Sequence, residues 1–188
     1  MIQVKDRHFE VMVSAEQLQK DIAVLAARIN EDYAGKEPLF VAVLNGAFMF
    51  TADLLKMVTI PCEVTFVKVA SYEGMSSTGQ VEEILGLEAD LTNRHIIILE
   101  DIVDTGLTMT ELLRNLRDFR PASVEVATLL LKPECLKFPL SIKYVAREIP
   151  NIFVLGFGLD YDGFGRNTRE LYCLAAPEIK VQSELNIL

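Results

Sequence analysis

The 188-residue sequence lacks tryptophan and contains only two histidines and three cysteines. Cys62, Cys135 and Cys173 are an odd number of cysteines, lie far apart and show no Cys-x-x-Cys spacing, which argues against a disulfide framework and a zinc knuckle. We expect buried free thiols in a reducing compartment. With His8 and His95 as the only histidines, the sequence also argues against a Ser-His-Asp triad or a histidine-based metal site.

Long apolar runs and an excess of basic residues are missing as well. No run approaches the roughly 18 uninterrupted apolar residues of a membrane span, and the N-terminus mixes both charge signs without the apolar core of a signal peptide. The 18 Lys and Arg residues against 27 Asp and Glu residues leave a net charge of −9, which disfavours binding to nucleic-acid phosphates. We therefore expect a cytoplasmic protein that binds neither membranes nor nucleic acids.

The sequence does contain a series of short apolar runs between helical patterns. Ser14 and Gln17 form a capping box at the start of the first helical pattern, and Gly35 offers its stop. The alternation predicts one α/β domain over residues 1–188, with a mostly parallel, twisted sheet covered by helices on both faces and a small flap formed by the chain ends. We expect helices over residues 15–33, 47–57 and 108–119, a mobile polar loop over 71–79, and strands over 39–44, 64–69, 81–87, 95–99, 124–131, 142–145 and 152–157.

Three carboxylates and a threonine-rich loop follow the most apolar of these runs, residues 96–99. Glu100 and Asp101 come directly after this run, Asp104 follows, and residues 105–110 (Thr-Gly-Leu-Thr-Met-Thr) open the next helix. Ligands of a doubly wound sheet bind beyond the carboxyl ends of its strands. The sequence therefore predicts a binding site at this point.

Each part of this segment has a chemical use. The loop of residues 105–110 offers backbone N–H groups, hydroxyl groups and a helix N-terminus, which together hold a phosphate monoester without a basic side chain. Glu100 and Asp101 can accept hydrogen bonds from two vicinal hydroxyls or coordinate a divalent cation. A phosphate and a diol together indicate a ribose 5-phosphate, and Asp104 is then placed to exchange a proton with the group attached to the sugar.

The same segment resembles the phosphoribosyl diphosphate motif of type I phosphoribosyltransferases. Its form, Glu-Asp-Ile-Val-Asp-Thr-Gly, is similar to that of the hypoxanthine-guanine branch, and the resemblance extends over about residues 10–172. It implies a glycosyltransferase of purine salvage, which uses Mg²⁺ to transfer ribose 5-phosphate from phosphoribosyl diphosphate to N9 of hypoxanthine. The products would be inosine monophosphate (IMP) and pyrophosphate. Guanine and xanthine remain open as substrates, and a homodimer or homotetramer is implied.

The resemblance also implies roles for individual residues. Asp104 would be the catalytic residue, and a cis peptide bond is expected between Leu44 and Asn45. The phosphoribosyl group would be bound by Glu100, Asp101, Asp104, Thr105, Gly106, Leu107 and Thr108, and pyrophosphate by Asn45, Gly46 and Arg166. The purine would be bound by Lys132, Phe153, Val154 and Asp160. The metal would be held by Glu100, Asp101 and Asp160, and Ser71 and Tyr72 would belong to a closing lid.

The sequence departs from the family pattern at Leu107, which fills a slot for lysine or glycine in the phosphate loop, at the glycine-rich residues 162–165 before Arg166, and at Asn45. Asn45 stands where the family commonly has Lys or Arg, so a positive charge is missing from the pyrophosphate turn and its contact falls on backbone N–H groups. Pyrophosphate should then depend more heavily on Mg²⁺ and Arg166.

Two other functions are compatible with parts of the pattern. Asp104-Thr105-Gly106 matches the tripeptide of aspartic proteases, but that fold is all-β and needs two such aspartates, and the sequence has no second Asp-Thr-Gly or Asp-Ser-Gly. The remaining alternative is a non-enzymatic regulator that senses nucleotides on the same fold.

Overall fold

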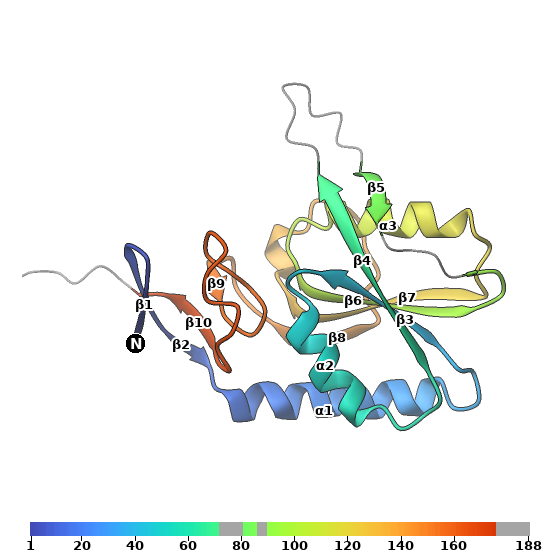
Figure 1. Cartoon of the computed structure of the whole chain (residues 1–188), viewed down its shortest axis with the longest axis horizontal. Coiled ribbons are helices and arrows are strands. Elements are labelled where there is room, and N and C mark those ends of the chain that lie inside the picture. The colour runs from blue at the N-terminus through green and yellow to red at the C-terminus, as the bar shows by residue number, and fades with distance from the viewer. Residues whose placement is uncertain (72–80, 86–89, 176–188) are drawn as a thin grey trace, which may run out of the picture.

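A computed structural model of the chain describes residues 1–71, 81–85 and 90–175, in which two sheets stand side by side (Figure 1). The larger sheet has the strand order β5-β4-β3-β6-β7-β8, and the smaller has the order β1-β2-β10-β9. All neighbouring strands of the larger sheet are parallel except β4 and β5. The predicted α/β fold with a mostly parallel sheet is therefore confirmed.

The elements follow one another along the chain in an alternating order. The strands are β1 (Ile2–Val4), β2 (Arg7–Val13), β3 (Leu39–Leu44), β4 (Glu63–Ser71), β5 (Val81–Leu85), β6 (His95–Val103), β7 (Ser123–Leu131), β8 (Tyr144–Glu148), β9 (Val154–Leu155) and β10 (Leu171–Leu174). The helices are α1 (Ala15–Asp32), α2 (Phe48–Met57), α3 (Leu107–Arg117) and the single 3₁₀ turn η1 (Pro133–Cys135).

Helices cover both faces of the larger sheet, and the alternation of strand residues explains why (Figure 1). In β3, Phe40 and Ala42 pack into the core shared with α1 and α2, whereas Val41 and Val43 pack into the core shared with α3. Successive side chains of a strand point to opposite faces, so a continuously apolar strand requires cover on both sides. Half of the predicted capping box forms: Oγ of Ser14 accepts a hydrogen bond from the backbone N–H of Gln17 at 3.2 Å, whereas the side chain of Gln17 donates to Asp21 Oδ1 at 2.9 Å.

The predicted flap is the smaller sheet, which joins the two ends of the described chain. Strands β1 and β2 come from the N-terminus, and β10 pairs antiparallel with both β2 and β9. The sequence prediction assigned residues 152–157 to the parallel sheet, and this was wrong. Only Val154 and Leu155 form a strand, and they pair with β10, because Gly156 and Gly158 with positive φ turn the chain out of the extended conformation.

Two other sequence expectations need separate mention. The three cysteines are free, as expected, but they are not buried: Cys62 is exposed, in the turn before β4, and Cys135 and Cys173 are half-buried. Within the described residues, no helix is long and apolar enough to cross a membrane.

Candidate active site

The three carboxylates predicted from the sequence lie at the carboxyl end of β6, at the edge of the sheet where ligands bind in such folds. Strand β6 is longer than expected: it continues to Val103 because it pairs with β7 as far as Leu131. Glu100 and Asp101 therefore belong to the strand and do not follow it. Beyond them, residues of β6, the connecting loop and the start of α3 line a cavity of about 110 Å³: Glu100, Ile102, Val103, Asp104, Thr105, Gly106, Leu107, Thr108 and Met109.

Gly106 lets the loop between β6 and α3 close tightly around this cavity. It is the N-cap of α3, with φ of 83°, a conformation that residues with a side chain rarely adopt. A Cβ at this position would lie 2.7 Å from Leu140, so the loop packs directly on the segment before β8. The first N–H groups of a helix have no partner within the helix, and the cavity lies at this end of α3. The loop can therefore bind an anion without a basic side chain.

Asp104 and Lys132 form an ion pair beside the loop. Lys132 Nζ donates to Asp104 Oδ2 at 2.7 Å. The side chain of Lys132 is only 9% exposed, whereas that of Asp104 is 46% exposed, so the lysine charge is buried and the carboxylate faces outward. The pair forms because β6 and β7 are neighbours: the backbone N–H of Lys132 donates to the carbonyl of Val103 at 3.0 Å.

Glu100, which is buried, and Asp101, which is half-buried, form an acidic pair at the end of β6. Burial raises the pKa of Glu100 well above its usual range, and the neighbouring Asp101 carboxylate raises it further. Oδ1 of Asp101 accepts a hydrogen bond from the backbone N–H of Ile102 at 2.8 Å. Two adjacent carboxylates, one of them buried, suit a divalent cation that shares its coordination with a substrate, since Mg²⁺ is usually held by one or two carboxylates plus phosphate oxygens.

The turn after β3 packs against this acidic pair. The peptide bond between Leu44 and Asn45 is cis, as expected. Gly46 lies between two other segments: a Cβ on it would lie 1.5 Å from Asp101 Oδ2, and the carbonyl oxygen of Gly46 is 2.0 Å from the place of a Cβ on Gly158. Strand β6, the turn after β3 and the loop after β9 therefore meet at Gly46. Gly158 is not among the site residues predicted from the sequence, although its spacing from Gly156 could have indicated a close backbone approach.

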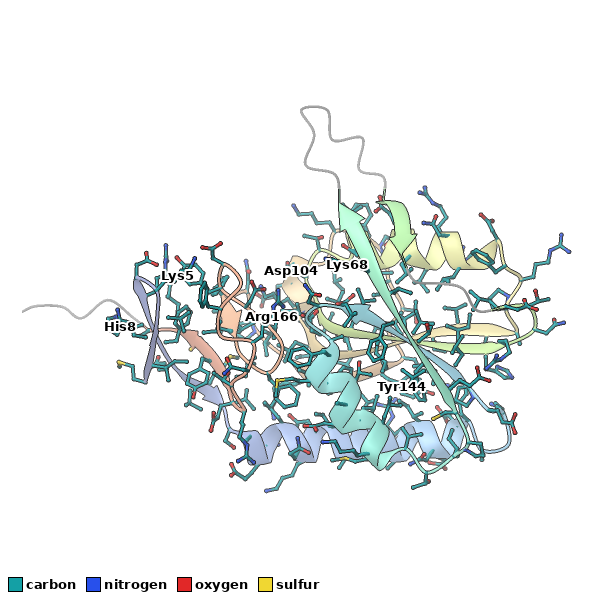
Figure 2. All side chains as sticks on the ribbon, viewed as in Figure 1. Lys5, His8, Lys68, Asp104, Tyr144 and Arg166 are labelled. Carbon is teal, nitrogen blue, oxygen red and sulfur yellow. The ribbon has the colours of Figure 1, made fainter. Side chains whose placement is uncertain are left out.

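Asp160 and Arg166 lie in the loop between β9 and β10. Arg166 Nη2 is 2.6 Å from Asp160 Oδ1, and Nη1 donates to the carbonyl of Gly158 at 2.8 Å. In Figure 2, Arg166 lies on the side of the smaller sheet that faces the larger one, in the same part of the view as Asp104. Among the described residues, no three carboxylate, histidine or cysteine side chains are close enough to hold one metal ion. The structure thus does not bring Glu100, Asp101 and Asp160 together, and Asp160 pairs with Arg166.

The remaining predicted residues differ in how exposed their side chains are and in whether the structure describes them. Phe153 is 47% exposed, as a ring that stacks on a ligand should be. Val154 is buried in the core, where its side chain supports the fold. The backbone of Ser71 pairs with Val81 at the end of β4, and Tyr72 lies outside the described residues, as does most of the expected lid.

Comparison with known proteins agrees with this geometry. Residues 14–162 match the family model of the phosphoribosyl transferase domain. The chain is 42% identical over 159 residues to a hypoxanthine-guanine phosphoribosyltransferase of Mycobacterium bovis, covering 81% of this chain and 79% of that protein. It is 38% identical over 159 residues to the enzyme of the same name from Staphylococcus aureus, covering 84% and 89%. A crystal structure of a hypoxanthine-guanine phosphoribosyltransferase from Bacillus anthracis, 32% identical, superposes with a TM-score of 0.81 over 90% of this chain and 99% of that one.

Proposed function

The chain belongs to the phosphoribosyltransferase family, and we propose that it is the purine salvage enzyme that makes IMP from hypoxanthine and phosphoribosyl diphosphate. Guanine and xanthine are the other candidate bases. In this reaction, N9 of the purine forms a bond to C1 of the ribose while the bond from C1 to the pyrophosphate oxygen breaks. A proton leaves the purine at N7.

The observation that carries this proposal is the ion pair of Asp104 and Lys132, with Nζ and Oδ2 2.7 Å apart. A 6-oxopurine presents N7 and O6 side by side on one edge. An ammonium group can donate to O6, and a carboxylate next to it can accept the proton from N7. The buried lysine and the exposed carboxylate thus match this edge in both chemistry and spacing, with Asp104 as the catalytic residue.

The cavity at the start of α3 supports the assignment of the sugar donor. We assign the 5′-phosphate of the ribose to the loop of Thr105, Gly106, Leu107 and Thr108, whose backbone N–H groups and helix N-terminus attract an anion. Glu100 lines the same cavity, and with Asp101 it would accept hydrogen bonds from the ribose hydroxyls or hold a cation. Asp104 lines this cavity and also pairs with Lys132. The ribose and the purine would therefore both contact the carboxylate of Asp104.

Mg²⁺ is the cofactor that this arrangement suits. Glu100 and Asp101 would hold it together with oxygens of phosphoribosyl diphosphate, and Asp160, which pairs with Arg166 in this structure, is the third candidate ligand. When bound, the ion supplies positive charge to the leaving pyrophosphate. Arg166 and the backbone N–H groups of the turn at Asn45 and Gly46 would bind the same leaving group.

The test is direct. Purified protein is mixed with phosphoribosyl diphosphate, Mg²⁺ and hypoxanthine, guanine or xanthine, and the nucleotide product is followed by absorbance. IMP formation that stops on addition of EDTA is the expected result. If no purine is converted while IMP still binds, the chain is the nucleotide-sensing regulator on this fold, an alternative that none of the relatives supports.

We also propose an oligomeric state and a compartment for the enzyme. Phe48, Val64 and Phe66 are each between 42% and 44% exposed, which supports a homodimer or homotetramer, and light scattering of the purified protein would measure the state. The free cysteines support a reducing compartment such as the cytoplasm.

A further inference from the structure

Phe153, the ring proposed to stack on the purine, belongs to a cluster of three aromatic rings. Its centroid is 6.2 Å from that of Phe9 and 5.9 Å from that of Tyr161, which meets it edge-on at 83°. Phe9 and Tyr161 are themselves 6.0 Å apart. Phe9 is fully buried on β2, whereas Phe153 is 47% exposed. One side of Phe153 is thus held by the other two rings, and the remainder is free to meet a ligand.

The hydroxyl of Tyr161 is held by the turn between β1 and β2. It donates to Oδ1 of Asp6 at 3.0 Å. The guanidinium carbon of Arg7 is 5.8 Å from the centroid of the Tyr161 ring. Asp6 and Arg7 are 155 and 154 positions away from Tyr161 in the sequence, so this contact exists only because β10 brings the chain ends together.

The same turn holds the loop of residues 161–164 at a second point. Lys5 forms an ion pair with Asp162, and its Nζ is 4.9 Å from the centroid of the Phe164 ring. The backbone groups of Tyr161 and Phe164 exchange hydrogen bonds at 2.9 and 3.1 Å, which close the loop. Asp160 and Arg166 stand at the two ends of this loop, and their own ion pair joins them there.

We propose that the turn between β1 and β2 sets the orientation of Phe153 through Tyr161, with Asp6, Phe9 and Tyr161 as positioning residues for the purine. Stacking depends on the tilt and offset of the two rings, and a half-exposed phenylalanine keeps one tilt only if its neighbours restrict it. Tyr161 restricts Phe153 from the edge, and Asp6 restricts Tyr161 in turn. This inference rests on the proposed function of the site.

A positioning role of these residues predicts a change in purine binding alone, whereas a purely structural role predicts a loss of stability. For the positioning role, loss of the Tyr161 hydrogen bond by Tyr161→Phe or Asp6→Ala should raise the KM for hypoxanthine about fivefold, the worth of one hydrogen bond. The KM for phosphoribosyl diphosphate and the melting temperature should stay close to those of the unchanged enzyme. Asp6→Asn should restore the normal KM, because the amide oxygen accepts the same bond. Asp118→Ala, an exposed aspartate at the far end of α3, is the matched control.

A second measurement does not require turnover. Because the chain has no tryptophan, Phe153→Trp places a single tryptophan at the stacking position, and IMP should quench its fluorescence. Adding Asp6→Ala should raise the IMP dissociation constant about fivefold, and adding Asp118→Ala should leave it unchanged. Equal dissociation constants in all three proteins, or a rise in both KM values together with a lower melting temperature, would overturn the inference. Failure of the unchanged enzyme to make any nucleotide would instead contradict the proposed function.

Discussion

The carboxylate of Asp101 occupies the space that a side chain at position 46 would need. A Cβ on Gly46 would lie 1.5 Å from Asp101 Oδ2, a separation that real atoms do not tolerate. The absence of a side chain thus allows the turn after β3 to pack on the acidic end of β6. Pyrophosphate and cation sites proposed for these two segments can therefore share one ligand.

Gly46→Ala should disrupt the site with little effect on the rest of the fold. The new methyl group would displace the Asp101 carboxylate, and a misplacement of about 1 Å can cost roughly a hundredfold in rate. We expect kcat/KM for phosphoribosyl diphosphate to fall by about tenfold to a hundredfold. Gly35→Ala is the control: a Cβ there contacts nothing within 4 Å, so that variant loses a little stability through its φ of 76° and keeps full activity. Equal activity of Gly46→Ala and Gly35→Ala would contradict the assignment.

Asp104→Asn should separate chemistry from binding. The amide keeps the shape of the side chain but cannot accept the proton from N7, so kcat should fall roughly 10²- to 10⁴-fold. Binding of phosphoribosyl diphosphate, measured by calorimetry, should remain nearly unchanged. If binding and rate fell by the same factor, Asp104 would act as a structural residue at the start of α3.

Lys132 should exclude adenine. An ammonium group has three donors and no acceptor, so it satisfies a 6-oxo group but meets the 6-amino group of adenine donor to donor. The side chain is only 9% exposed and pairs with Asp104, and sites built around such a hydrogen bond discriminate by roughly 10⁴- to 10⁵-fold. The ratio of kcat/KM for hypoxanthine and adenine measures this. A ratio below ten, or one that Lys132→Ala leaves unchanged, would mean that another group reads the purine.

Asn45→Lys should tighten pyrophosphate binding. Asn45 is exposed, so a lysine there would add a screened contact, and we expect the inhibition constant of pyrophosphate to fall by about twofold to fivefold. The dependence of pyrophosphate binding on Mg²⁺ concentration should weaken in the same variant. Asn45→Gln keeps the polarity without the charge and should change neither quantity.

The pH dependence of stability should reveal how much the hydrogen bonds to Asp32 stabilise the folded state. Hydrogen bonds from the Tyr144 hydroxyl at 2.6 Å and from Lys143 hold the pKa of the Asp32 carboxyl below its ordinary value of 3.8. A lowered pKa stabilises the folded state above pH 3.8, and this contribution is lost as the pH falls through the folded pKa. Tyr144→Phe should therefore lower the melting temperature at pH 7, by an amount that shrinks below pH 3.8. In a protein that already carries Asp32→Asn, the effect of Tyr144→Phe on the melting temperature should not vary with pH.

The local pattern of the sequence determined most of the elements and the centre of the site. The apolar runs, the helix-start signal at Ser14 and the loop of residues 105–110 depend on neighbours within a few positions. These short-range preferences predicted α1, β3 and α3 close to their observed bounds, whereas β6 continues four residues beyond its predicted end at residue 99. Because parallel strands end at one edge of the sheet, the carboxylates after residue 99 also had to lie where ligands bind.

Tertiary structure alone decided how distant segments meet. The ion pair of Asp104 and Lys132 depends on β6 and β7 being neighbours, and the support of Phe153 by Phe9 and Tyr161 depends on the pairing of the chain ends. The strand prediction for residues 152–157 failed for the same reason. An apolar run indicates burial but not the sheet it joins, because that choice is made by packing energy between residues far apart in the sequence.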